Sequence, residues 1–432
     1  MNKKGNVMSS LNNRRSIADD VYFTSVTDKK FKVNRVSVIF ISKLSEDAAV
    51  NAVVPRILSK CNEKLDTMAK LNRRLAELYE TSINWSVRAD ADYQFCELSA
   101  TVLADRFALD GEQILKEATK ILIDCIFHPY LENGMFPAQS LELEKQNQID
   151  DNDADINDMT HYAYLKGYEE AFRGEPAEIR WGGTNEQVSA ITSESAMKAY
   201  RRIIGEMRTE VICVGESDFD GISDMFAEAF SSIERRPEGL VNAMVSTPKN
   251  EVSRIEEVFE VEQSKLVMFF KTPLRNKYQL LVTQMLYGGN ETSKLFLNVR
   301  EKMSLCYFCF SRLGFAKGFI CTECGVDLKN LEKAEEECLN QLSDMVKGDF
   351  TDDDIMHTKL DITNNLLTVR DTVSGISSHT LLCILFPESA FSIEEAVKEV
   401  ESVTRGDIIE AAGSLTLDTV YVLRSKGGAE NE

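Results

Sequence analysis

The sequence contains the same order of predicted elements twice, and this repetition constrains the fold more than any other feature. The first copy has a β-branched strand at 33–42, helical stretches, alternating strands at 83–90 and 93–103, and a helix at 111–127. The second copy has a strand at 264–272, helical stretches at 278–289 and 293–302, strands at 305–312 and 318–327, and a helix at 330–348. Repetition of a strand–helix–strand–helix unit predicts an α+β fold of two structurally similar halves. The expected fold is a duplicated α/β roll, in which each half is an antiparallel sheet with helices packed on one face.

A polar, proline-bearing stretch from Glu234 to Glu251 separates the two copies and is the expected linker. The predicted domains are therefore an N-terminal α+β domain at 1–233 and a C-terminal α+β domain at 252–432. A chain of 432 residues is also long enough for two hydrophobic cores.

Composition and charge exclude several classes of partner. The net charge of −21 disfavours nucleic acid and anionic membranes, which are bound through basic surfaces. No apolar run approaches the roughly 18 residues that span a bilayer, and the basic N-terminal residues precede no apolar signal segment. Ten cysteines in so long a chain are too sparse for a disulfide framework. We therefore expect a cytoplasmic protein that binds neither nucleic acid nor membrane.

Two Cys-x-x-Cys pairs raise the possibility of a structural zinc site. Cys306 with Cys309, and Cys321 with Cys324, match the number and spacing of a four-thiolate centre. Both pairs lie in predicted strands, where residues three apart point to opposite faces, and neither contains a turn residue. The pattern favours buried free thiols over a metal site, although metal binding by this set stays open.

Other candidate metal and catalytic motifs are incomplete. Asp151, Asp153 and Asp155 resemble the start of a calcium loop, but Ile156 and Tyr162 stand where glycine and glutamate are required. The four histidines are widely separated, and no paired-histidine zinc motif, GxSxG, P-loop or GxGxxG is present. We expect no catalytic residue, no metal and no cofactor in this chain.

Arg300 and Tyr307 remain as a candidate binding pair. Arg300 lies near a predicted helix end, and Tyr307 follows seven residues later on the next strand. Both side chains donate hydrogen bonds, and a peptide carbonyl is a suitable acceptor. The alternative is a surface arginine and a tyrosine that packs on the sheet.

The sequence around this pair resembles a known family. Its motifs are Leu286–Gly289, Ser293–Phe296, Val299–Lys302 and Leu305–Tyr307. They are similar to the C-terminal half of the insulinase/pitrilysin superfamily, in particular the branch of mitochondrial processing peptidase and its bacterial relatives. The duplicated halves, the helix with Glu144–Lys145, the stretch 183–192 and the strand end at Val214–Gly215 extend the resemblance to nearly the whole chain.

The resemblance also locates a missing metal site. Active family members carry HxxEH and a distal glutamate, which together bind zinc and activate water. Here the matching helix reads Ala52-Val53-Val54-Pro55-Arg56, and the distal position falls at Asp150 or Asp151. No histidine lies between residues 1 and 127, so the N-terminal domain lacks the zinc motif wherever the alignment is placed.

In the family, the arginine and tyrosine that match Arg300 and Tyr307 contact substrate peptide. The chain thus resembles the bacterial non-zinc, inactive subunit of heterodimeric members. This implies a partner subunit that bears HxxEH, a peptide substrate, and proteolysis only in the assembled heterodimer. The alternative is a peptide-binding or scaffold pseudo-peptidase that acts as a homodimer without proteolysis.

Overall fold

The computed structural model describes residues 13–240, 244–386 and 392–426. Residues 241–243 of the expected linker lie outside the described residues. So do residues 1–12, in which no signal peptide is expected. No helix in the described part of the chain is long and apolar enough to cross a membrane.

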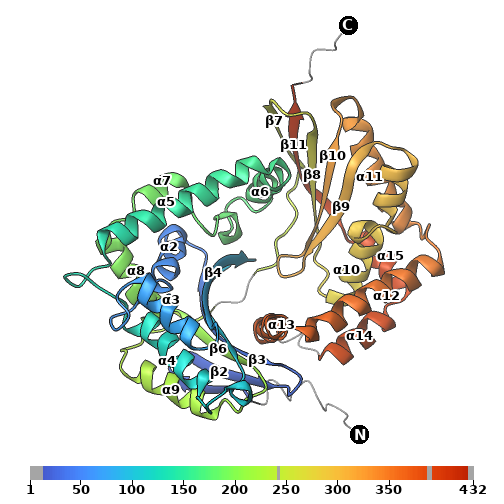
Figure 1. Ribbon diagram of the computed structural model, residues 1–432. Helices are drawn as coiled ribbons and strands as arrows, with labels where there is room; N and C mark the ends of the chain where they lie inside the picture. The colour runs from blue at the N-terminus through green and yellow to red at the C-terminus, as the bar shows by residue number, and fades with distance from the viewer. Residues whose placement is uncertain (1–12, 241–243, 387–391, 427–432) are drawn as a thin grey trace. The chain divides into compact units, whose positions relative to one another are not determined.

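The described strands form two sheets (Figure 1). The first is six-stranded in the order β1-β2-β6-β3-β5-β4, and the second is five-stranded in the order β7-β11-β8-β10-β9. The first sheet contains β1 (Arg15–Ala18), β2 (Val21–Thr27), β3 (Val33–Lys43), β4 (Ser82–Asp90), β5 (Tyr93–Leu103) and β6 (Arg208–Gly215). The second contains β7 (Ser253–Phe259), β8 (Ser264–Lys271), β9 (Cys306–Gly314), β10 (Phe319–Val326) and β11 (Thr416–Ser425). All neighbours are antiparallel except β2 with β6 and β7 with β11.

Helices connect and cover the strands. The α-helices up to residue 231 are α2 (Ala48–Leu58), α3 (Met68–Glu77), α4 (Ile114–Phe127), α5 (Ala138–Ala154), α6 (Met159–Ala171), α7 (Asn185–Ser189), α8 (Ser193–Gly205) and α9 (Asp220–Ser231). Those that follow are α10 (Lys277–Gln284), α11 (Leu331–Val346), α12 (Asp352–Thr368), α13 (Val373–Leu385), α14 (Ile393–Ser402) and α15 (Arg405–Gly413). Short 3₁₀ turns are η1 (Asp105–Phe107), η2 (Asp155–Asn157), η3 (Pro176–Glu178), η6 (Leu328–Asn330) and η7 (Val369–Asp371). Two segments, η4 (Met285–Gly289) and η5 (Leu295–Lys302), are π-helical.

The first sheet has its main core on one face. Alternate residues of β3, namely Val36, Val38 and Phe40, belong to a large buried cluster with side chains of α2, α4, α8 and α9. Strand side chains alternate between faces, so the buried Ile39 and Ile41 point to the other face. Helix α13 contacts β3 and β6 but contributes nothing to the large cluster, so it covers this second face.

The second sheet repeats this arrangement. Helix α6 contacts β8, β10 and β11, and Phe172 at its end packs with Phe269 and Phe319 of the sheet. The ring centroids of these three aromatic side chains lie 5.2–6.3 Å apart. Helix α11 contacts β8 and β10 and packs with α15. Since the buried Cys324 of β10 meets α11 and Cys321 belongs to the α6 cluster, these helices lie on opposite faces.

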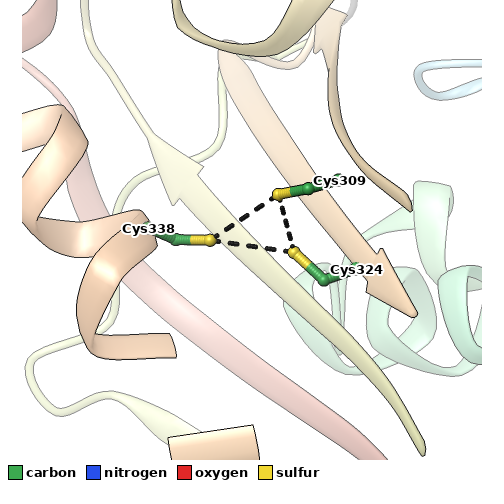
Figure 2. Close-up of side chains that lie close together, drawn as sticks. All are labelled: Cys309, Cys324 and Cys338. Carbon is green, nitrogen blue, oxygen red and sulfur yellow. Dashed lines mark hydrogen bonds between the residues drawn. The ribbon is translucent and has the colours of Figure 1, made fainter. Parts of the chain in front are cut away.

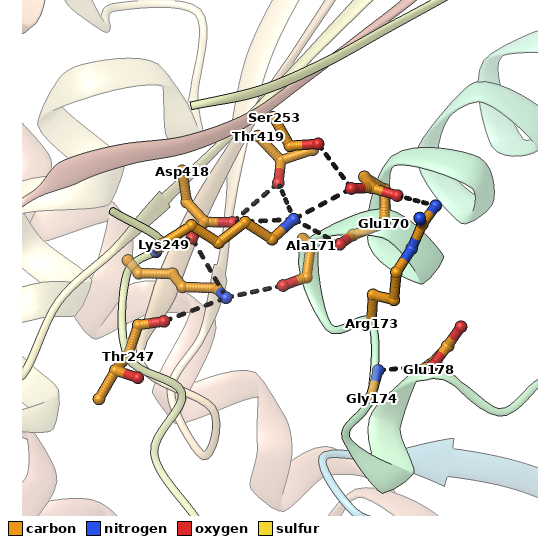
Figure 3. A network of polar contacts seen from close by, with 11 residues as sticks. Glu170, Ala171, Arg173, Gly174, Glu178, Thr247, Lys249, Ser253, Asp418 and Thr419 are labelled. Carbon is orange, nitrogen blue, oxygen red and sulfur yellow. Dashed lines mark hydrogen bonds and ion pairs between the residues drawn. The ribbon is translucent and has the colours of Figure 1, made fainter. Parts of the chain in front are cut away.

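A buried polar network joins α6 to the second sheet (Figure 3). The ammonium of Lys249 donates to the Glu170 carbonyl oxygen at 2.7 Å and to its carboxylate at 3.2 Å. Lys271, only 2% exposed, lies 3.3 Å from the fully buried carboxylate of Asp418 and donates to the Ala171 carbonyl at 2.7 Å. Burial lowers the pKa of Lys271. These contacts satisfy carbonyl groups at the end of α6 that the helix itself leaves unpaired.

The chain divides into two compact units whose sequence ranges are interleaved. The first contains residues 1–152, 179–242 and 368–392, and the second contains 153–178, 243–367 and 393–432. Most of the expected domains, 1–233 and 252–432, fall in one unit each. The exceptions are 153–178, which includes α6, and 368–392, which includes α13. Each of these segments belongs to the unit built mainly from the other half of the chain.

The expected α+β class with two similar halves is confirmed. The strands and helices expected from the repeated pattern all form, including β3, β5, β8, β10 and α11. The structure adds the parallel pairs of β2 with β6 and β7 with β11, and one helix on the second face of each sheet.

Candidate functional site

Arg56 is held in the interior by helix α2. All eleven residues of this helix are buried, and the Arg56 side chain is only 4% exposed. Its guanidinium lies 4.1 Å from the centre of the Trp85 ring, which suits a cation–π contact. Its Nη2 forms an ion pair with the Asp151 carboxylate of α5, whose side chain is 58% exposed. A fixed positive charge therefore links α2 to α5.

This ion pair joins the two positions at which the family resemblance places zinc ligands. Ala52 has no donor atom, Pro55 cannot activate water, and Arg56 brings a cation where a metal ion would lie. Of the two aspartates considered for the distal position, Asp151 already balances Arg56 and Asp150 is exposed. The residues present do not fit a zinc ion.

Next to this pair, a polar network crosses the interior of the first unit. The Asn51 amide donates to the Gln94 side-chain oxygen at 2.9 Å, and Arg202 donates to the Asn51 oxygen at 2.8 Å. Arg202 also pairs with Asp47 at 3.1 Å. These groups tie α2 to β5 and α8. Sequence reasoning missed them because their spacing along the chain carries no motif.

Arg300 is placed by the π-helical segment η5, and such segments are frequent at functional sites. Its side chain is 39% exposed, and its guanidinium lies 4.5 Å from the centre of the Phe296 ring. The nearest carboxylate is that of Glu301, at 3.7 Å. Arg300, Phe296 and Phe308 line a small pocket of about 230 Å³. A strong hydrogen-bond donor thus stands beside an aromatic pocket.

Tyr307 lies at a β-bulge near the start of the edge strand β9. The register with β10 shifts here: Phe308 pairs with Gly325, and Cys306 pairs with Val326. Tyr307 is the extra residue, and its side chain is turned outward and is 54% exposed. Its hydroxyl donates to Asp327 at 3.1 Å, and this hydrogen bond raises the pKa of Tyr307.

Arg300 and Tyr307 are both accessible, as the candidate pair requires. Each has its own local partner, and no contact in the described part of the chain joins them directly. Their role in binding therefore remains a prediction.

The four cysteines of the two Cys-x-x-Cys pairs do not gather around one point. Cys309 and Cys324 are directly opposed on β9 and β10, and both point toward α11. Cys321 points to the other face and packs with the aromatic cluster beneath α6. Figure 2 shows that Cys338 of α11 completes the group instead. All ten cysteines are free, and nine of them are buried.

The bulge corrects one step of the sequence reasoning. Alternation predicts opposite faces for Cys306 and Cys309, yet both are buried, because Tyr307 and Phe308 both turn outward between them. Alternation does hold for Cys321 and Cys324. Cys338 was missed because it lies in no Cys-x-x-Cys pattern.

The acidic residues of the incomplete calcium motif lie in helix α5 and in the 3₁₀ turn η2 that follows it. Asp151 and Asp153 lie within helix α5, where they do not form a loop. Asp155 lies 3.6 Å from His161.

The chain therefore combines two α+β units with a helix α2 that offers no metal ligand at Ala52, Pro55 or Arg56. The family description "Peptidase M16 inactive domain" matches residues 190–360. A protein of Bacillus subtilis named "Probable inactive metalloprotease YmfF" is 28% identical over 433 residues, covering 98% of this chain and 100% of that protein.

Solved structures agree on the fold. A conserved protein from Enterococcus faecalis is 24% identical, with a TM-score of 0.90 over 97% of this chain and 100% of its own. A peptidase M16 inactive domain from Pseudomonas fluorescens is 15% identical, with a TM-score of 0.80 over 97% and 99%. In its sequence the chain is similar to inactive members of the insulinase/pitrilysin superfamily, and the solved structures share its fold.

Proposed function

We propose that this chain is the non-catalytic subunit of a heterodimeric zinc metallopeptidase. A related chain with an HxxEH motif would supply the metal and the activated water. This chain would supply half of the peptide-binding cavity and the Arg300–Tyr307 pair. The observation that carries this proposal is the contrast between two sites: Arg56 and Asp151 neutralise each other at the metal position, whereas Arg300 is only half-buried and Tyr307 is exposed.

Arg300 and Tyr307 have the chemistry to hold a peptide carbonyl. The guanidinium offers several N–H donors in a fixed plane, and the phenol offers one O–H donor. Tyr307 would exchange its hydrogen bond with Asp327 for one with the peptide, at little net cost because one partner replaces another. Tyr307 lies on β9, the edge strand of its sheet, and an extended peptide can pair with the edge of a sheet.

The proposed setting is the cytoplasm, with a peptide and a related subunit as partners. Ten free cysteines suit a reducing compartment. The charge of −21 supports a partner other than nucleic acid or an anionic membrane.

The test uses the full chain with an HxxEH-bearing relative encoded in the same genome. The two proteins are purified separately, mixed, and assayed for complex formation and for hydrolysis of unstructured peptides. We expect a stable heterodimer, activity only in the mixture, and none from this chain alone.

Variants then test the binding pair. Donors that stabilise charge on the attacked carbonyl contribute on the order of 10²–10³ in rate. Arg300→Ala or Tyr307→Phe should lower the activity of the complex by about that factor without dissociating it. Lys302→Ala, an exposed cation on the same segment, serves as the matched control and should leave the rate unchanged. Full activity of both site variants would remove the pair from the mechanism.

The local partners of Arg300 and Tyr307 favour a second function, in which the pair does not contact a substrate. Arg300 lies near Glu301 and Tyr307 bonds Asp327, as expected for side chains with purely structural roles. In that case the protein is a peptide-binding or scaffold pseudo-peptidase that acts as a homodimer without proteolysis. A homodimer by light scattering that ignores the HxxEH-bearing chain would support this function over the first.

A further inference from the structure

Three cysteine sulfurs meet in the core of the second unit (Figure 2). Cys309 comes from β9, Cys324 from β10 and Cys338 from α11. The Sγ–Sγ distances are 2.9 Å for Cys309–Cys324, 3.8 Å for Cys309–Cys338 and 3.7 Å for Cys324–Cys338. All three side chains are at most 3% exposed.

The register and the helix spacing explain the meeting. Cys309 and Cys324 are directly opposed residues of antiparallel strands, so their side chains point to the same face. On α11, Ala334, Cys338 and Leu342 recur every four residues and form part of its buried side. The thiol of Cys338 is thereby placed over the opposed pair.

The distances suit a single cation bound by sulfur. Zinc–thiolate bonds are about 2.3 Å long, so sulfurs around one such ion lie roughly 3.8–4.0 Å apart. The two distances to Cys338 already match this value. The Cys309–Cys324 distance must open by roughly 1 Å, which a small rotation of either side chain provides.

We propose that Cys309, Cys324 and Cys338 form a binding site for one thiophilic d¹⁰ cation, of which Zn²⁺ and Cu⁺ are the biological examples. Thiolate ligands select these ions over Mg²⁺, Ca²⁺ and Mn²⁺, which prefer oxygen. This set replaces the four cysteines considered from the sequence, since Cys321 faces away and Cys338 takes part.

Thiols lose their protons when they bind a metal ion, so binding to this set should become tighter as pH rises. Cys309 also lines the 230 Å³ pocket beside Arg300, so the cysteine cluster lies next to this pocket.

The number of ligands separates the two ions. Structural zinc is four-coordinate, whereas three thiolates are enough for Cu⁺ in a dry site. Cys306 is the available fourth ligand, because the bulge leaves it on the buried side, where its thiol interacts with Cys309. Cys306→Ala should therefore weaken the binding of Zn²⁺ and leave that of Cu⁺ unchanged.

The test uses the full chain, purified without oxygen in the presence of reductant and stripped of metal. Zn²⁺ and Cu⁺ are added in separate titrations and followed by native mass spectrometry and thermal unfolding. We expect one ion per chain and a higher unfolding temperature for at least one of them. X-ray absorption of the loaded wild-type protein should show three sulfur neighbours with Cu⁺ or four with Zn²⁺, and it requires no variant.

Matched cysteine variants complete the design. Cys338→Ala should weaken binding by more than the roughly 10–100-fold that losing an outer-shell partner costs. Cys321→Ala, buried on the opposite face of the same sheet, should bind as the wild type does. Three results would overturn the proposal: no ion bound by the wild type, equal binding by both variants, or a Cys309–Cys324 disulfide formed under these reducing conditions.

Discussion

Replacing Asp151 by asparagine would test whether the Arg56–Asp151 ion pair supports the helix that lacks its metal ligands. The change preserves the size of the side chain and removes its charge. It leaves the Arg56 guanidinium 4% exposed, in contact with Trp85, and without a carboxylate. The guanidinium has little other compensation, because its buried Nε has no hydrogen-bond partner in the described part of the chain.

The expected loss of unfolding free energy follows from how deeply Arg56 and Asp151 are each buried. A hydrogen bond to a charged group contributes about 1.5–3 kcal/mol. Because Asp151 is 58% exposed, solvent screens the pair, and the loss should lie near about 2 kcal/mol. For a unit of this size, that corresponds to a fall of roughly 4–8 °C in the unfolding temperature.

The assay is urea and thermal unfolding of four proteins: the wild type, each single variant and the double variant. Arg56→Met with Asp151→Asn should recover to within about 1 kcal/mol of the wild type, because an apolar replacement of a buried pair is often nearly neutral. Asp150→Asn, an exposed neighbour on the same helix, is the control and should cost under about 0.5 kcal/mol. If Asp151→Asn costs no more than this control, the ion pair does not stabilise α2.

Three other predictions concern stability, all measured by urea unfolding. Gly183→Ala should cost about 1–3 kcal/mol more than Gly174→Ala. Both glycines have positive φ (69° and 81°), but only at Gly183 would a Cβ lie 2.4 Å from another side chain; equal costs would contradict this. Lys271→Met should cost about 3 kcal/mol, because it leaves the fully buried Asp418 without its closest cation. A cost below about 1 kcal/mol would show that Lys271 does not stabilise the Asp418 carboxylate. Burial raises the pKa of Glu323 in the folded state. The free energy of unfolding should therefore decrease as pH rises above 4.5, the pKa of this carboxyl in the unfolded chain. Glu323→Gln should remove this pH dependence.

Much of the fold is readable from the chain, because its strands and helices carry strong local patterns. β3 and β5 alternate or run apolar, and α4 has an apolar face at helical spacing. β7 is harder to recognise, since no residue in it is fully buried and its partner β11 lies more than 150 residues away. Pairing over such distances depends on the tertiary fold and leaves no local pattern.

The candidate site could be predicted only in part from spacing and strand alternation. The exposure of Arg300 and Tyr307 agrees with a binding role, but their neighbours Glu301 and Asp327 could not be assigned as partners from spacing. The bulge at Tyr307 has no glycine or proline to mark it, so strand alternation misplaced Cys306. To predict a site whose residues come from separate elements, one must know the register of the sheet and the rotation of each helix about its axis.

The interleaved ranges of the two units have a consequence for synthesis on the ribosome. Helix α13, which covers the second face of the first sheet, belongs to the segment 368–392. At about 5–20 residues per second, more than 150 residues must be translated after β6 before this helix emerges. During those seconds Ile39 and Ile41 stay uncovered, and the nascent chain offers an apolar surface that a ribosome-associated chaperone can bind. A fragment released after residue 233 would keep that surface exposed for its whole lifetime.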